Sequence, residues 1–220
     1  MLRKEHTNHS DQTDTREKIL VAAAELFAEK GYRATTIALI CEKAQANIAA
    51  VNYYFRSKEN LYQAAWQYAH RKLMTKVPPD GGVSDDAPPE AKLRGRIKAG
   101  LQKAMLPNAA AISIMHKEMA TPTGLLQQVI HDAIKPVRTA TQAILQELLG
   151  PSATSLDVEL CEICVVSPCM HIAHHQQTVA HGCPGPAFKP EMLDDMVEHF
   201  TGYALAGIRE IRRRIEERAN

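Results

Sequence analysis

Residues 35–58 read TTIALICEKAQANIAAVNYYFRSK, and this stretch decides the fold of the N-terminal part of the chain. Thr35 provides an N-cap for a short helix whose apolar residues fall on one face. Residues 44–47 (AQAN) predict a tight turn, and residues 48–54 predict a second short helix that ends in paired tyrosines. Ser57 then provides the N-cap of a further helix. The stretch is therefore typical of a helix-turn-helix that presents one small helix at the surface.

The residues before this stretch supply a supporting helix. Asp14 and Glu17 have the spacing of a capping box, and Gly31 is placed to end the helix. Between them, apolar residues recur at helical spacing: Ile19, Leu20, Ala23, Leu26 and Phe27. Residues 1–13 are polar and lack periodicity, which predicts a disordered arm. We therefore expect a three-helix helix-turn-helix domain over residues 14–60.

The second short helix of the motif has the composition of a DNA recognition helix. A small side chain such as Ala49 allows close approach to the floor of the major groove, while Asn52 and Tyr53 offer polar groups to bases and phosphates. Helix N-termini bind phosphate through hydroxyls and backbone N–H groups. The predicted DNA contacts are Thr35, Thr36, Asn47, Ile48, Ala49, Asn52, Tyr53 and Lys58. The alternative is a helix-turn-helix used only for packing or protein contact. We expect Tyr54 and Phe55 to belong to the core.

These residues resemble the TetR/AcrR family of transcriptional regulators. Residues 15–32 fit its pattern T-x-x-x-I-L-x-A-A-x-x-L-F-A-E-x-G-Y, the double threonine lies at 35–36, and Tyr-x-Phe followed by Ser-Lys-Glu lies at 53–59. Asn52 stands where many members have a tyrosine, and this variation is similar to the CecR-like subgroup. The resemblance implies a repressor that binds a palindromic operator in double-stranded DNA.

Short motifs in the rest of the chain are similar to the same subgroup. They lie at 115–122, 134–136, 148–150, 169–170 and 203–209. The resemblance implies an all-helical homodimer, in which a small-molecule effector changes the spacing of the two DNA-binding heads and releases the operator. It implies a helical ligand-binding and dimerisation domain over residues 61–220.

Composition and periodicity independently favour an all-α fold. Alanine is abundant, aromatic residues make up only 5% of the chain, and no long stretch alternates with period two. Helices are predicted at 90–106, 108–120, 123–149, 155–179 and 190–217. Pro136 predicts a kink or a break in the third of these. The prolines and glycines of residues 77–89 (VPPDGGVSDDAPP) predict a linker or a mobile loop.

Bulk properties limit the classes of protein to consider. No apolar run approaches the roughly 20 residues needed to cross a bilayer, and the polar N-terminus lacks the apolar core of a signal peptide. We therefore expect a cytoplasmic protein with no membrane partner. The net charge of +1 does not by itself indicate a nucleic-acid binder. DNA affinity must then come from the placement of charge and from helix N-termini.

Residues 161–183 hold four cysteines and four histidines. His171 and His175, at positions i and i+4, could share a metal ion on one helix face, which leaves a metal- or thiol-responsive regulator as the alternative function. The residues between Cys161 and Cys164 are Glu-Ile within an apolar helix, whereas a metal-binding knuckle needs a turn. We therefore expect no metal site, buried cysteines, and histidines that serve an interface or a pocket.

Methionines and histidines on separate helices predict an effector pocket, with plain core packing as the alternative. The predicted pocket residues are Met115, Met119, Met170, His171 and His174. The helices at 155–179 and 190–217 predict a four-helix dimer interface. The basic run at 209–218 alternates with glutamates, which predicts a solvated face. The sequence contains no G-x-S-x-G, H-E-x-x-H or phosphate-binding glycine loop, so we expect neither an enzyme nor a cofactor.

Overall fold

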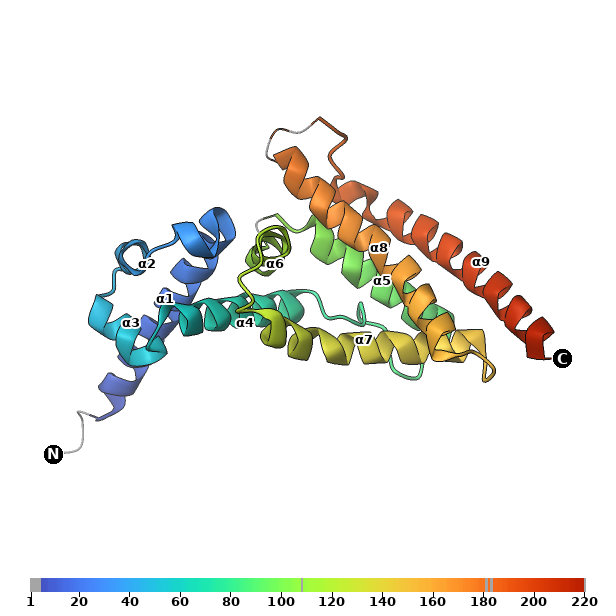
Figure 1. Cartoon of the computed structure of the whole chain (residues 1–220), viewed down its shortest axis with the longest axis horizontal. Coiled ribbons are helices and arrows are strands. Elements are labelled where there is room, and N and C mark those ends of the chain that lie inside the picture. Colours follow the sequence, from blue (N-terminus) through green and yellow to red (C-terminus); the bar gives the residue numbers. More distant parts are fainter. Residues whose placement is uncertain (1–4, 108, 181, 183, 220) are drawn as a thin grey trace. The chain divides into compact units, whose positions relative to one another are not determined.

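Every regular element in the described part of the chain is a helix, which confirms the predicted all-α fold (Figure 1). The computed structural model describes residues 5–107, 109–180, 182 and 184–219, and for residues 5–13, 180 and 219 it describes the backbone alone. The chain divides into two compact units. The described part of the first, here called the head unit, runs through Leu73 and adds residues 109–131. The second, the body unit, contains residues 74–107 and the described residues after 131.

The head unit holds the predicted helix-turn-helix and two further helices. Its helices are α1 (Glu5–Ala34), α2 (Ile37–Ala44), α3 (Ile48–Phe55), most of α4 (Lys58–Lys76), α6 (Ala110–Ala120) and the start of α7 (Gln127–Leu149). The body unit holds the remainder of α7 together with α5 (Pro89–Met105), α8 (Ser155–Ala180), a short 3-10 turn (Pro190–Met192) and α9 (Leu193–Ala219). Within it, α5 packs against both α8 and α9 (Figure 1).

Helix α1 begins earlier than the sequence predicts. Residues 1–4 of the predicted disordered arm lie outside the described residues, but the backbone of residues 5–13 is helical and continues into the rest of α1. No proline or glycine interrupts the chain before Gly31, so nothing stops the helix from extending backwards. Asp14 is therefore not an N-cap. It instead pairs with Lys18 one turn later, at 2.6 Å.

The predicted division at residue 60 does not match the compact units. The first half of α4 is buried within the head unit through Leu61, Tyr62, Ala65 and Trp66. The Tyr62 ring lies 4.7 Å, centroid to centroid, from Phe27 of α1. Edge-to-face aromatic pairs of this kind add stabilisation beyond the area that they bury. The first half of α4 is thus a structural part of the head unit.

Three hydrogen bonds tie α4 to the segment around α6. The Tyr62 hydroxyl donates to Glu118 (3.2 Å), the Gln63 amide donates to the Leu125 carbonyl (2.8 Å), and the Trp66 indole donates to the Ala111 carbonyl (3.2 Å). The Glu118 carboxylate also accepts from the backbone N–H groups of Thr123 (2.8 Å) and Gly124 (3.0 Å). Helix α6 is therefore fastened to α4 at both of its ends.

The proline-rich segment at 77–89 forms consecutive turns. Backbone hydrogen bonds run from Gly81 to Pro78 (3.1 Å) and from Ala87 to Ser84 (3.1 Å). The segment lies against α5, because a Cβ atom placed on Gly95 would be only 2.2 Å from the Asp80 carbonyl oxygen. Pro89 begins α5, where a proline is tolerated because its missing N–H has no helical partner. The segment is therefore a packed connection.

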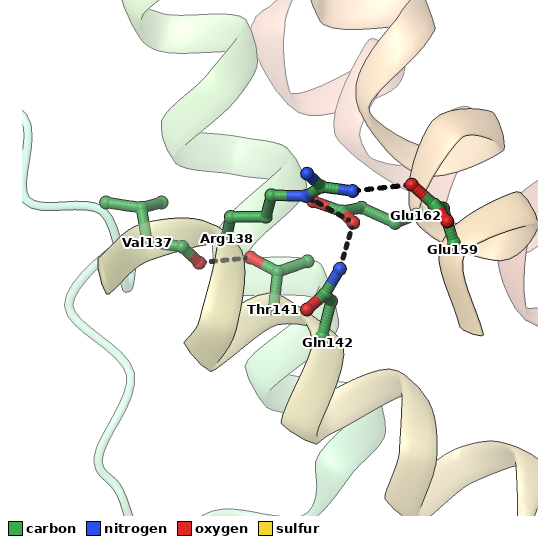
Figure 2. Close-up of polar contacts among 6 residues, drawn as sticks. All are labelled: Val137, Arg138, Thr141, Gln142, Glu159 and Glu162. Atoms are coloured by element: carbon green, nitrogen blue, oxygen red, sulfur yellow. Dashed lines mark hydrogen bonds and ion pairs between the residues drawn. The ribbon is translucent and has the colours of Figure 1, made fainter. Parts of the chain in front are cut away.

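Helix α7 continues through Pro136, so the predicted break is absent. Beyond the proline, α7 is joined to α8 by a polar cluster (Figure 2). Arg138 Nε donates to the Glu162 carboxylate at 3.0 and 3.1 Å, and its NH2 group donates to Glu159 at 2.9 Å. Gln142 donates a third hydrogen bond to Glu162, at 2.7 Å. The buried Glu162 is thereby satisfied by two residues of α7.

Replacing Arg138 with leucine is expected to lower the urea midpoint of unfolding. The substitution leaves the buried Glu162 carboxylate with Gln142 as its remaining α7 partner. A buried carboxylate that loses its cation is destabilising, although the Arg138 side chain is itself 47% exposed. A double variant with both Arg138 and Glu162 changed to leucine should recover most of the loss, because no unpaired charge remains. A single variant as stable as the parent protein would contradict a structural role for the pair.

Candidate nucleic-acid interface

The two helices of the motif are held by caps and by a left-handed turn. Thr36 Oγ1 accepts from the Leu39 N–H (3.2 Å) at the start of α2, and Asn47 Oδ1 accepts from the Ala50 N–H (2.8 Å) at the start of α3. Gln45 ends α2 with φ 52° and ψ 40°. Its backbone N–H donates to the carbonyl of Glu42. A non-glycine residue in this conformation is uncommon, and here it produces the sharp reversal between α2 and α3.

Helix α3 has one buried face and one exposed face. Val51 and Phe55 are buried and anchor the helix in the head unit. Ile48 is 54% exposed and Tyr53 is 73% exposed. Ala49 and Asn52 are also exposed. The residues predicted to contact DNA from this helix therefore share an outward face, while Phe55 belongs to the core as predicted and Tyr54 is half-buried.

The double threonine divides into one cap and one core residue. Thr36 is exposed and caps α2. Thr35 is fully buried, and its hydroxyl lies 2.8 Å from the Gly31 carbonyl oxygen and 3.2 Å from that of Leu26. The predictions that Thr35 caps α2 and offers its side chain to a phosphate are therefore wrong, because its hydroxyl is satisfied inside the head.

The start of α4 provides a second helix N-terminus close to α3. Ser57 Oγ accepts from the Asn60 N–H at 3.2 Å, as an N-cap does. Lys58 Nζ lies 4.2 Å from the centroid of the Tyr32 ring, a cation–π contact. Burial lowers the pKa of Lys58, and the neighbouring Glu59 opposes this effect. The Tyr32 hydroxyl donates to Glu59 at 2.7 Å, and burial together with that carboxylate raises the pKa of Tyr32 to about 12.

Asn47 and two arginines modify the predicted contact set. Because Asn47 Oδ1 already caps α3, its side chain is not free to bond an adenine edge through both of its polar atoms. Arg56 is exposed at the C-terminal end of α3, and the guanidinium of Arg16 lies 5.5 Å from the Phe55 ring centroid. Both are exposed cations beside the recognition helix, of the type that contacts phosphates. The signal missed for Arg56 was its position between Phe55, which ends α3, and Ser57, which caps α4.

The predicted pocket residues fall into two groups in different units. Met115 and Met119 lie on α6 in the head unit, and Met119 is 66% exposed. Met170, His171 and His174 lie on α8 in the body unit, where both histidines are exposed. Exposed side chains do not line an enclosed cavity within their own unit. That residues of α6 and α8 face one another across one effector pocket therefore stays a prediction.

The cysteines and histidines of α8 lie in different environments and do not form one cluster. Cys161 is buried and Cys164 is exposed. The rings of His171 and His175 are stacked at 6.3 Å, but His175 Nε2 lies 2.8 Å from the Pro186 carbonyl oxygen. Within the described residues, no group of three or more His, Cys, Asp or Glu side chains could hold a metal ion. His181 and Cys183 lie outside those residues.

Two family models match the chain. One, described as bacterial regulatory proteins of the tetR family, matches residues 19–65. The other, described as the C-terminal domain of the HTH-type transcriptional dual regulator CecR, matches residues 89–208. The chain is also 35% identical over 52 residues to the probable HTH-type transcriptional regulator YttP of Bacillus subtilis (strain 168). That match covers 24% of this chain and only 25% of the relative's length.

Solved structures show the same fold. A Clostridium perfringens putative fatty acid metabolism regulator has a TM-score of 0.67 at 18% identity, over 86% of this chain and 97% of that chain. The regulator PfmR of Thermus thermophilus has a TM-score of 0.63 at 21% identity, over 86% and 95%. No described helix is long and apolar enough to span a membrane.

The family model of the CecR C-terminal domain alone covers more than half of the residues. The chain therefore belongs to the TetR family of bacterial transcriptional regulators, with a CecR-type C-terminal domain.

Proposed function

We propose that this regulator is a homodimeric repressor that binds a palindromic operator, with one head on each half-site, and leaves the DNA when a small molecule binds. The observation that carries the proposal is the two-sided α3, buried through Val51 and Phe55 and exposed through Ala49, Asn52 and Tyr53. A surface helix that served packing alone would be polar on its outward face, whereas here Ile48 and Tyr53 are exposed on it. The proposed regulatory role involves no catalysis. The cytoplasmic location that the sequence predicts is part of the same proposal.

The DNA contacts follow from the exposed groups around α3. Ile48, Ala49 and Asn52 enter the major groove, with Asn52 offering an amide to base edges. The N-termini of α2 and α4, with Thr36 and Lys58, hold phosphates on either side. Tyr53 reaches a phosphate through its hydroxyl. In this arrangement, contacts with the DNA backbone position α3 in the groove, and a few side chains determine which base sequence is preferred.

Replacing Tyr53 with phenylalanine is expected to weaken binding to the DNA upstream of the protein's own coding region by about 3- to 10-fold, the value of one hydrogen bond. The side chain is 73% exposed, so thermal stability should not change. Fluorescence anisotropy at fixed salt measures the affinity. Tyr203→Phe, an equally exposed tyrosine in the body unit, is the matched control. Unchanged affinity in the Tyr53 variant would contradict a role for its hydroxyl.

The dimer is supported by an apolar surface on α8. Leu156, Leu160 and Ile163 are each more than half exposed, and Val166 is 41% exposed. The spacing of the first three places them on one helix face. Exposed apolar patches on soluble proteins commonly mark interaction sites. Pairing α8 and α9 with the same helices of a second copy would cover this surface with a four-helix arrangement.

Coupling between effector and DNA is supported by the attachment of α6 to α4. The hydrogen bonds of Tyr62, Gln63 and Trp66 join α4 to α6 and to the segment after it, and α6 also packs against α1 in the head unit. Helix α4 follows the recognition helix directly and ends in the body unit. An effector shifts the spacing of the heads only if it binds one conformation more tightly than the other. Displacement of α6 or the C-terminal end of α4 is the route that we propose for that shift.

A further inference from the structure

Helix α5 is enclosed but strongly basic. Every residue from 91 to 106 is buried or half-buried. The helix nevertheless carries five basic residues: Lys92, Arg94, Arg96, Lys98 and Lys103. Removing a charge from water is costly unless a partner of opposite charge compensates. The partners of these five side chains therefore show whether the charges serve the fold.

Two of the five have an acidic partner among the described residues. Lys92 pairs with Glu147 of α7 at 3.8 Å, and Arg94 Nε donates to Glu198 of α9 at 3.0 Å. The side chains of Arg96 and Lys103 make no hydrogen bond and no ion pair with any residue that the structure describes. Carboxylates of the 77–89 segment attract them electrostatically: Asp80 attracts both residues, and Asp85 attracts Arg96. The Asp80 carboxylate itself accepts from the Gly82 N–H at 2.7 Å.

Arg96 and Lys103 lie on the same face of α5. Their separation of seven residues is two helical turns, so they project from one side about 10 Å apart along the axis. Gly100 lies between them, and α8 closes against this point. A Cβ atom on Gly100 would be 2.7 Å from Cys169 Sγ, and that thiol is 3.9 Å from the Ile97 carbonyl oxygen. Two cations therefore flank a tightly packed α5–α8 contact.

The surroundings disfavour both charges as they stand. Burial and, secondarily, the repulsion from Arg96 lower the pKa of Lys103 to about 8. Burial also lowers the pKa of Arg96. The Cys169 thiol is no counter-ion, because burial raises its pKa to about 11 and keeps it neutral. An anion that reaches the charged ends of both side chains would favour the charged form of both, and charge-assisted hydrogen bonds to it would be strong.

We propose that Arg96 and Lys103 form the recognition site for the acidic head group of the effector, a carboxylate- or phosphate-bearing organic molecule. Arginine presents a planar fork that matches either group, and lysine adds a second positive charge. This inference rests on the proposed effector-controlled function. It names the chemical class of the ligand and assigns recognition of the ligand to α5. The pattern of methionines and histidines in the sequence predicted pocket residues on other helices.

Titration calorimetry on the full-length protein without DNA tests this site. The probes are decanoate, benzoate and decyl phosphate, with decan-1-ol as the uncharged analogue. The test variant carries Arg96→Met and Lys103→Met. Its melting temperature should equal or exceed that of the parent, because two half-buried charges that have no hydrogen bond or ion pair are removed. The control is Lys98→Met. Lys98 is a half-buried cation on the other side of the same helix, and it has no acidic partner among the described residues.

We expect at least one anion to bind in a 1:1 ratio, decan-1-ol not to bind, and the double variant to lose about 10- to 100-fold in affinity. Binding of decanoate or benzoate identifies a carboxylate, and binding of decyl phosphate alone identifies a phosphate. Any of three results would overturn the site: no anion binds, decan-1-ol binds equally well, or the double variant loses no more than the Lys98 control. Because DNA is absent, a failure of operator binding would not alter these outcomes.

Discussion

Replacing Ala49 with glutamate is expected to reduce specific DNA binding by at least about 100-fold while leaving the protein folded. Ala49 is exposed at the second position of α3, on the face that we propose enters the major groove. The longer side chain would block close approach of the helix, and its negative charge would be repelled by the phosphates. Several base contacts would be lost together, at about 1–3 kcal/mol each.

The same substitution should not destabilise the free protein, because a carboxylate in the first turn of a helix interacts favourably with the helix dipole. Anisotropy titration with upstream DNA gives the affinity, and thermal unfolding gives the stability. Ala143→Glu, an exposed alanine of α7, is the matched control and should bind DNA normally. Equal DNA affinity of the Ala49 variant and the parent protein would contradict the placement of α3 in the groove.

Replacing Leu160 with glutamate is expected to convert the proposed dimer to a monomer and to weaken operator binding by about 100-fold or more. Leu160 is 52% exposed at the centre of the apolar face of α8, beside Ile163. A charge buried without a partner in the proposed interface would oppose association. Once the heads are separate, the second half-site is no longer bound at the high effective concentration that a tether provides.

Light scattering after size-exclusion chromatography distinguishes the two states. The mass should fall to that of one chain, 24.3 kDa, while the helical circular dichroism spectrum is retained. Ala143→Glu serves again as the control and should stay dimeric. A Leu160 variant that keeps the mass of two chains would show that this face of α8 is not the interface.

The sequence predicted the helix-turn-helix well because its signals are local. Caps, turn residues and apolar spacing act within a few residues, and the structure confirms the positions of α2 and α3 and the cap at Ser57. The assignment of the cap to Thr35 was wrong because the local sequence does not show which of the two threonines is buried. Adjacent threonines have equal propensity to cap, and only the packing of α1 against the turn decides which hydroxyl is buried.

The parts that the sequence did not predict depend on contacts between distant residues. The membership of α6 in the head unit rests on its packing against α1, and it is supported by hydrogen bonds between residues 45–62 positions apart. The charges of Arg96 and Lys103, which pair with no described residue, are equally invisible in the sequence, where five basic residues on one helix resemble a solvated surface. They become informative only when the enclosure of α5 and the partners of Lys92 and Arg94 are known.

Affinity of the purified protein for the DNA upstream of its own coding region, measured at two salt concentrations, tests the central claim most directly. The competitor is the same fragment with the two half-sites of its palindrome scrambled. We predict tight binding of two chains per site, a clear loss of affinity at higher salt as phosphate contacts require, and at least about 1,000-fold preference for the intact palindrome. Equal affinity for intact and scrambled DNA would contradict a head that recognises an operator.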